Sequence, residues 1–339
     1  MRIFSQRTSV RSYPGPAKLL LLALLIATIP LFGLNDELSL DAQIVMSGYF
    51  DEGTIELYSH NFLDVKQKPS LGLAYNLQFN RKGDNFGYLA FQGRMAYSEH
   101  TDSNLQFQLY DAYADISLEN FDLWAGHHRT PVGLSSYLDS HPLIMSDNTY
   151  SGLNFNRDWG VGIGFDRHYP SVNLALTTGS GMPLKMKENF LFSGRVGWWD
   201  YAEDDIALGV SAAAGKVLQT IGYEVLDGGR RQDLFVGGVD FSKKIANFYG
   251  HGDVLWGSYE GDAAHSVMGR LGMNILEDEK LNVEIQGMNI EMGSYATNIL
   301  SLGGGYELAP HLDLRGVLNI SNRKHLNAII LQLYYNRGF

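Results

Sequence analysis

Apolar residues recur at every second position through most of the chain after residue 42. In segment 71–79 (LGLAYNLQF), leucine, tyrosine and phenylalanine occupy the odd positions, and small or amide residues occupy the even ones. In segment 158–166 (DWGVGIGFD), tryptophan, valine, isoleucine and phenylalanine alternate with aspartate and glycine. A period of two is typical of β-strands, because successive side chains point to opposite faces. We count about sixteen such segments between residues 42 and 339, and we predict a single all-β domain.

Two architectures contain many strands of this kind: a soluble β-sandwich and a closed antiparallel transmembrane β-barrel. The polar face of the segments is often Gly, Ser, Asn or Asp, which suits a water-filled interior. Aromatic residues gather near segment ends, as in Trp198 and Trp199 and in Tyr334 and Tyr335, and such positions are typical of interfacial girdles. Strands of about ten residues match the span of a tilted membrane strand. These features favour an all-β, closed antiparallel transmembrane β-barrel of about 16 strands.

Two places interrupt the alternation. Segment 129–156 has no clean period and predicts a long loop. Within segment 105–118 the apolar parity changes near Tyr110, which predicts a β-bulge or a crossing between two environments.

The last segment, 329–339 (IILQLYYNRGF), alternates almost to the C-terminal Phe339. In a barrel this strand must pair with the first one, because hydrocarbon leaves no partner for an open sheet edge. A terminal aromatic after alternating apolar residues resembles the signal that bacterial outer-membrane proteins present to their barrel-assembly machinery. The residues that carry this resemblance are Leu331, Leu333, Tyr335 and Phe339, and Arg337 departs from it because an apolar residue is usual there.

The N-terminus has a different pattern. Arg2, Arg7, Arg11 and Lys18 precede an apolar run from Leu19 to Phe32 that only Thr28 and Pro30 interrupt. This is the pattern of a secretory signal peptide, and the run is short for a membrane-spanning helix. We predict a signal peptide at 1–33 and an outer-membrane β-barrel at 34–339, with an N-terminal membrane anchor as the alternative.

Composition and charge exclude several kinds of protein. The 339 residues include no cysteine, which excludes a disulfide framework and thiolate metal sites. The whole chain carries 26 basic and 37 acidic residues, and removal of 1–33 takes away four basic residues and leaves a net charge of −15. A nucleic-acid partner is disfavoured, because such surfaces need basic patches.

Several stretches resemble a known family. Residues 110–134 (YDAYADISLENFDLWAGHHRTPVGL), with Trp124-Ala125-Gly126 and Thr130-Pro131-Val132-Gly133-Leu134, are followed by Arg157-Asp158-Trp159-Gly160-Val161. Later, the stretch LSLGGGY at 300–306 precedes Pro310-His311-Leu312. The order and spacing of these motifs resemble the phosphate-selective porin O and P family. The resemblance implies a sixteen-stranded, trimeric bacterial outer-membrane porin with a long third loop folded into the lumen. It would make 129–156 the constriction loop, with these candidate residues: Arg129, Pro131, Gly133, Asp139 and Asp147.

The charged residues on the predicted interior parity bear on solute selectivity. Acidic residues outnumber basic ones about two to one, and no lysine cluster is present, unlike in the anion-selective members of that family. We therefore expect weak or cation-leaning selectivity. The alternative is an anion- or phosphate-selective pore in which the arginines form a positive stripe rather than pairs with carboxylates. The predicted pore-lining residues are Arg94, Asp122, Asp158, Asp166, Arg195, Asp240, Asp253, Arg270, Glu284, Glu307, Asp313 and Arg315.

Other chemistry has weaker support in the sequence. His127, His128 and His141 could suggest a metal site, but neighbouring strand residues point to opposite sides, and solvated loop histidines are the favoured interpretation. The carboxylate clusters at 203–205 and 277–279 could bind Ca²⁺ or bridge lipopolysaccharide, although solvated turns explain them as well. The glycines at 303–305 lie inside a strand pattern, where bends or close packing are expected.

We expect a porin for passive diffusion of small hydrophilic solutes and ions, with no cofactor or metal. Its expected partners are outer-membrane lipid, lipopolysaccharide, the assembly machinery and two further copies of the chain. One rival is an outer-membrane hydrolase that uses Ser135, Ser136, His127 and Asp139. The other rival is a channel-less structural barrel.

Overall fold

The computed structural model describes residues 35–51, 53–57, 68–81, 84–97, 104–134, 144–165, 170–198, 206–221, 223–225, 227–276, 280–293, 295–323 and 326–339. The predicted signal peptide at 1–33 lies outside these residues. No helix of the described part is long and apolar enough to cross a membrane. The strands are, in chain order, β1 (Asn35–Tyr49), β2 (Thr54–Glu56), β3 (Ser70–Arg81), β4 (Asp84–Tyr97), β5 (Leu105–Ser117), β6 (Asp122–Arg129), β7 (Arg157–Phe165), β8 (Ser171–Thr177), β9 (Phe190–Trp198), β10 (Ile206–Leu218), β11 (Thr220–Ile221), β12 (Glu224–Val225), β13 (Arg231–Ile245), β14 (Phe248–Tyr259), β15 (Asp262–Ile275), β16 (Leu281–Met292), β17 (Tyr295–Ala309), β18 (Leu312–Ser321) and β19 (Ala328–Gly338).

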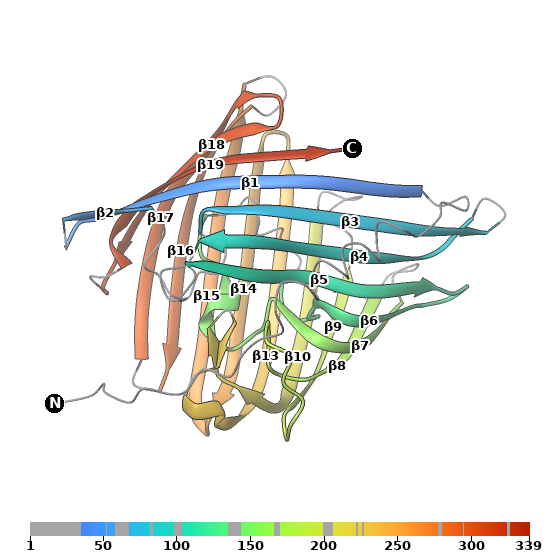
Figure 1. Ribbon diagram of the computed structural model, residues 1–339. Helices are drawn as coiled ribbons and strands as arrows, with labels where there is room; N and C mark the ends of the chain where they lie inside the picture. Colours follow the sequence, from blue (N-terminus) through green and yellow to red (C-terminus); the bar gives the residue numbers. More distant parts are fainter. Residues whose placement is uncertain are drawn as a thin grey trace.

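Sixteen strands of the described chain form one closed antiparallel barrel, which confirms the predicted fold (Figure 1). Each strand pairs with its neighbour in sequence, and β1 pairs with β3 on one side and β19 on the other. The backbone amide of Phe339 donates to the carbonyl of Leu38, 2.8 Å away, and extends this closing seam to the C-terminus. The short strand β2 pairs with β1, and β11 and β12 form a separate two-stranded sheet. All backbone ladders of the barrel are thereby closed, as a barrel without free edges requires.

The two ends of the barrel differ. At one end, which we call the turn end, short connections join β3 to β4, β5 to β6, β7 to β8, β9 to β10, β13 to β14, β15 to β16 and β17 to β18. At the other end, the loop end, lie the long connection 130–156 and the segments 178–189 and 219–230. Both β1 and β19 have their terminal ends at the turn end.

The two faces of the wall follow the alternation in the sequence. Large apolar side chains such as Leu71, Phe235, Leu271 and Leu331 are exposed on the outer face. The intervening positions point inward, and many of them are buried polar residues such as Gln332 and Ser301. This arrangement is the reverse of a soluble β-sandwich, which would bury its apolar faces against each other.

The bulge predicted in segment 105–118 is present. Gln92 pairs with Asp111 and the next residue, Gly93, pairs with Leu109, so that Tyr110 is the extra residue of β5. After Tyr110, odd-numbered rather than even-numbered residues of β5 face the interior, because one extra residue reverses the alternation. The first strand begins at Asn35, earlier than the predicted start at residue 42.

Tyr334 does not belong to an outer aromatic girdle, contrary to the sequence-based prediction. It is 5% exposed on the inner face, and the guanidinium of Arg315 lies 4.5 Å from the centre of its ring. Tyr335 is the residue of this pair that carries the outward parity with Leu331 and Leu333. The sequence pattern is ambiguous here because both positions are tyrosine.

Candidate functional site

The described parts of the loop between β6 and β7, residues 130–134 and 144–156, lie against the inner wall on the far side of the barrel. Gly133 has a φ of +63°, and its backbone amide donates to Ser211 Oγ of β10 at 3.0 Å. A Cβ at this glycine would lie 2.7 Å from a carboxylate oxygen of Asp253 on β14. Because no side chain fits there, glycine allows the loop to lie against both strands.

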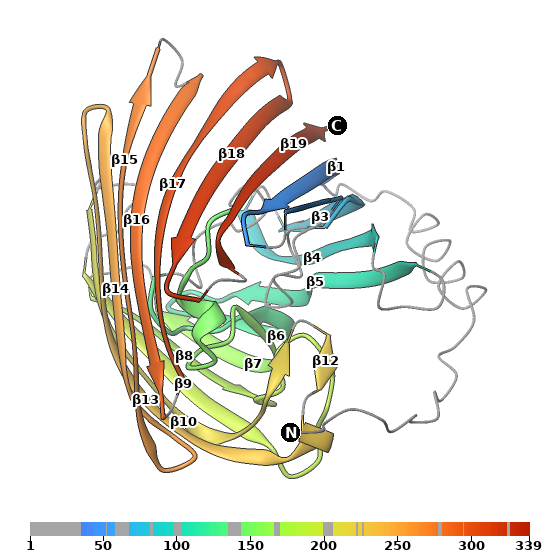
Figure 2. The same cartoon turned by 90° about the vertical axis from the view of Figure 1, so that its left-hand side faces the viewer.

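The return half of the loop is held by polar contacts to the same wall. The side chain of Asn148 donates to the carbonyl of Asp253 at 2.9 Å and accepts from Ser266 Oγ at 2.7 Å. The carbonyl of Ser146 accepts from Gln286 Nε2 at 2.7 Å. Asp147 is the N-cap of the 3-10 helix η1 (Asn148–Ser151), where its carboxylate accepts from the backbone amide of Thr149. Figure 2 shows η1 inside the space that the barrel strands surround.

Apolar contacts seal the loop against the wall. Val132 and Leu153 pack with buried residues of β9, β10, β13, β14 and β15 in one apolar cluster. Met145 reaches β17, where a Cβ on Gly303 would lie 2.4 Å from its terminal methyl group. Gly303 therefore leaves the space that Met145 occupies, in keeping with the close packing expected at this glycine run from the sequence.

A second segment, which no pattern in the sequence predicts, also enters the interior. The connection between β10 and β13 carries β11 and β12, and the hydroxyl of Tyr223 donates to the carbonyl of Leu109 on β5 at 2.5 Å. This contact lies beside the β5 bulge. The guanidinium groups of Arg94 and Arg157 lie 4.8 and 5.5 Å from the ring centre of Tyr110 at the bulge.

A third segment, 178–189, is anchored by the carboxylate of Asp158. This group is 0% exposed and accepts from the backbone amides of Gly179, Ser180 and Gly181 at 2.5, 3.2 and 3.0 Å. It also accepts from Thr178 Oγ1 at 2.8 Å. The contacts of Asp158 are thus with a loop of the protein, which differs from the predicted role of this residue in lining an open wall.

The inward-facing arginines form pairs rather than a positive stripe. Arg195 on β9 forms a bidentate ion pair with Asp240 on β13, at 2.9 and 2.6 Å. The guanidinium crosses β10 at Gly209, where a Cβ would lie 2.4 Å from its Nη2 atom. Arg315 forms an ion pair with Asp313.

Two further arginines have polar partners on neighbouring strands. Arg270 donates to Gln286 Oε1 at 2.8 and 2.6 Å and lies 3.9 Å from Glu284. Arg94 donates to Gln108 at 2.8 Å. Arg195, Arg270 and Arg94 thus each join two different strands of the wall, whereas Arg315 and Asp313 both belong to β18.

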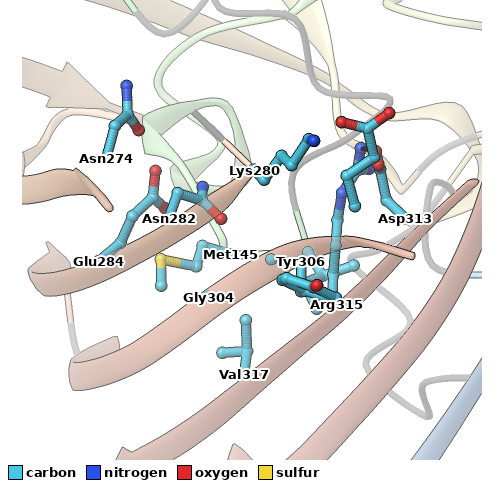
Figure 3. Close-up of a pocket in the computed structure, with 13 residues that line it drawn as sticks. Met145, Asn274, Lys280, Asn282, Glu284, Gly304, Tyr306, Asp313, Arg315 and Val317 are labelled. Carbon is cyan, nitrogen blue, oxygen red and sulfur yellow. Dashed lines mark hydrogen bonds and ion pairs between the residues drawn. The ribbon is translucent and has the colours of Figure 1, made fainter. Parts of the chain in front are cut away.

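A cavity of about 360 Å³ lies between Met145 of the loop and the wall of β15–β18 (Figure 3). A second cavity of about 520 Å³ continues toward the turn end. The two share Asp313 and Arg315. Their ionisable lining residues are Glu37, Lys280, Glu284, Glu307, His311, Asp313 and Arg315. Four of these residues are carboxylic acids, whereas only Lys280 and Arg315 are strongly basic. The lining of the two cavities therefore has a net negative formal charge.

The remaining predicted residues lie at the ends of β6, in the adjoining loop, on the outer face or outside the described residues. Asp122 opens β6 with inward parity, opposite Ser117 and Gly164. Arg129 ends β6, and Pro131 is buried at the start of the loop. Leu331, Leu333 and Phe339 are exposed on the outside, with Arg337 stacked 5.0 Å from the Phe339 ring. Asp139, Ser135, Ser136, His141, Asp166 and the carboxylate clusters 203–205 and 277–279 lie outside the described residues.

The prediction of solvated loop histidines is wrong for His127 and His128. Both lie in β6, and His127 is 0% exposed, with its ring 4.8 Å from Trp159. The His128 ring is 3.8 Å from Tyr113 on the opposite face of the strand. The described residues contain no cluster of three or more potential metal ligands.

No protein-family model matches the sequence, and no curated protein sequence matches it. The resemblance to the phosphate-selective porin O and P family therefore stays a prediction. The structure is similar to that of an anion-selective porin from Comamonas acidovorans, with a TM-score of 0.63 and 11% identity over 91% of this chain and 99% of that one.

Two further solved structures have the same architecture. OmpF of Salmonella typhi gives a TM-score of 0.62 and 10% identity over 90% of this chain and 97% of that one. The trimer form of OmpT, an outer membrane protein of Vibrio cholerae, gives a TM-score of 0.60 and 11% identity over 90% of this chain and 100% of that one. At such identities the likeness extends to the fold alone.

Proposed function

We propose that this protein is a bacterial outer-membrane porin through which small hydrophilic solutes and ions diffuse passively. The observation that carries the proposal is the combination of an apolar outer face with an interior of buried polar side chains in a closed barrel. Lipid accommodates the first surface and water the second. The similarity to solved porin structures supports the same conclusion.

The loop 129–156 acts as the constriction in this proposal. Its described residues lie against β10, β14, β15, β16 and β17, and so they occupy part of the cross-section of the barrel. The connection between β10 and β13, which contains Tyr223, contacts β5 and so narrows the lumen from the opposite side of the barrel. A sixteen-stranded barrel would otherwise leave a wide aqueous channel.

Weak cation preference is the proposed selectivity. The pairs Arg195–Asp240 and Arg315–Asp313 contribute no net charge, and the cavities near the turn end contain more carboxylates than basic groups. Unbalanced carboxylates on a pore wall attract cations. An anion-selective pore would need arginines that face the solute rather than carboxylates, and this disfavours the phosphate-selective alternative.

Residues 1–33 would direct export, and Leu331, Leu333, Tyr335 and Phe339 would be read by the barrel-assembly machinery. The outer face would contact lipid and lipopolysaccharide. We propose a homotrimer, in line with the trimer form of the Vibrio cholerae protein.

Planar-bilayer recording of the refolded full-length barrel tests the proposal. Stable ohmic steps are expected, with a reversal potential in a potassium chloride gradient that has the sign of cation preference. The absence of conductance, together with hydrolysis of lipid or peptide, would instead favour the hydrolase. The absence of both would favour a structural barrel.

A further inference from the structure

The inner wall of β4–β6 carries a group of aromatic side chains near the turn end. The rings of Tyr88 and Tyr113 meet edge to face at 5.7 Å, and their hydroxyl groups are 3.2 Å apart. The ring of His128 stacks on Tyr113 at 3.8 Å and lies 5.0 Å from Trp124. These four residues, the aromatic wall, come from three adjacent strands and share one face.

The aromatic wall is open to the interior rather than part of a sealed core. All four side chains are partly exposed. None of them belongs to the four apolar clusters found among the described residues. Aromatic rings that face an aqueous lumen are available to a solute.

The neighbouring strand β7 adds no bulky side chain to this part of the inner wall. The inward positions of β7 that follow Asp158 are Gly160, Gly162 and Gly164. The Trp124 indole lies over Gly162, where a Cβ would be 2.3 Å from its Nε1 atom. Gly162 thus gives the indole a flat support, and Gly160 and Gly164 place no side chain beside it.

Two carboxylates lie within the same part of the wall. Asp115 on β5 is the register partner of Tyr88 on one side and of Trp124 on the other. Asp122 lies one inward position nearer the turn end. Neither carboxylate forms an ion pair with any residue that the structure describes, in contrast to Asp111, which is paired with Arg157.

We propose that the aromatic wall, together with Asp115 and Asp122, binds small organic ammonium cations that enter the lumen. A cation beside Asp115 would meet an aromatic ring from each adjacent strand. Aromatic faces attract ammonium groups through the ring quadrupole, and quaternary ammonium ligands are commonly bound in aromatic cages. The carboxylates add Coulomb attraction. The inference rests on the proposed pore function, because the ligand must reach the lumen.

Calorimetric titration of the refolded full-length protein in detergent with choline chloride tests the site. Saturable binding of choline is expected, whereas glucose, a neutral solute of comparable size, is expected to give none. Trp124→Ala and the double variant D115N/D122N are each expected to weaken choline binding about tenfold. Trp124→Phe, which keeps an aromatic face, retains most of the affinity.

Matched controls lie elsewhere in the chain. Trp256→Phe changes an outward-facing tryptophan, and Asp262→Asn changes an exposed aspartate at the loop end. Both are expected to leave choline affinity unchanged. Heat-dependent migration on a gel confirms a folded barrel for each variant, and the conservative replacements keep the test valid if Trp124→Ala does not fold.

Three outcomes would overturn the site: no saturable choline binding by the wild type, equal binding of glucose, or unchanged affinity in Trp124→Ala or D115N/D122N. Calorimetry needs no ionic current. Choline binding without bilayer conductance would therefore count against the pore, and conductance without choline binding would count against this site alone.

Discussion

The side-chain amide of Gln332 donates a 2.7 Å hydrogen bond to the side-chain oxygen of Gln43, although 289 positions separate the two residues in sequence. Both side chains are buried on the inner face at the seam where β19 meets β1. The bond joins the first and last strands of the barrel by side chains as well as by backbone.

Replacement of Gln332 by leucine removes this bond. We expect the free energy of unfolding to fall by about 0.5–1.5 kcal/mol, the usual net contribution of one hydrogen bond. Urea unfolding in lipid vesicles, followed by tryptophan fluorescence, measures the change. Leu331→Ile, which alters the adjacent outward-facing residue at constant volume, serves as the control. Equal loss in both variants would show that the seam does not depend on this bond.

Gly303→Val should displace Met145 and the return half of the loop. Even the Cβ of a larger residue would overlap the methyl group of Met145 and lie 2.9 Å from Val317. We expect faster proteolysis within the loop 129–156 and an altered single-channel conductance. Gly287→Ala is the matched control, because a Cβ at that outward-facing glycine has no atom within 4 Å. Identical proteolysis of Gly303→Val and the wild type would contradict the packing of Met145 against Gly303.

Asp158→Ala should release segment 178–189. The substitution removes the acceptor of three backbone amides and one hydroxyl group, all in a buried setting. We expect a loss of about 3 kcal/mol in unfolding free energy, since charge-assisted hydrogen bonds are among the stronger ones. Amide exchange at Gly179 and Gly181 should accelerate by orders of magnitude. Slow exchange at these amides in the variant would show that other contacts hold the segment.

Glu37→Gln combined with Glu307→Gln should reduce cation preference. Both carboxylates line the cavities near the turn end, and their removal lowers the negative charge there. The reversal potential in a salt gradient is expected to move toward zero, with a larger effect at low ionic strength because salt screens the field. Asp262→Asn, at the opposite end of the barrel, should leave the reversal potential unchanged. If the double variant and Asp262→Asn shifted the reversal potential equally, residues other than Glu37 and Glu307 would set the selectivity.

Tyr223→Phe should loosen the segment that carries β11 and β12. Burial raises the pKa of the Tyr223 hydroxyl well above its usual value, so this group stays protonated and able to donate to Leu109 at neutral pH. Loss of the bond is expected to increase the noise of the single-channel current and its mean amplitude. Tyr335→Phe, on the outer face, is the control. A Tyr223→Phe channel as quiet as the wild type would indicate that the segment is held by other contacts.

The alternation in the sequence was sufficient to predict the barrel, because a membrane wall repeats one simple rule along every strand. Segment 158–166 is a clear example: its glycines point inward and its aromatic and aliphatic residues point outward. Ambiguity arises where both parities carry similar residues. Tyr334 and Tyr335 are indistinguishable by type, and only the register with β18 and β1 decides which one faces the interior.

The interior contacts were less accessible from sequence, because they join residues that are distant along the chain. The pairing of Arg195 with Asp240 requires the strand order and the gap at Gly209. The aromatic wall was missed because Tyr88, Asp115 and Trp124 become neighbours only through the register of β4, β5 and β6. The inward path of the Tyr223 segment has no periodic signal.

The position of β19 between β18 and β1 has a consequence for a shortened barrel. Deletion of β19 would leave β1 without a second neighbour, and β18 as well. The wall would then have two rows of unpaired amides and carbonyls, which acyl chains cannot satisfy. One missing strand would therefore open the barrel along its whole height.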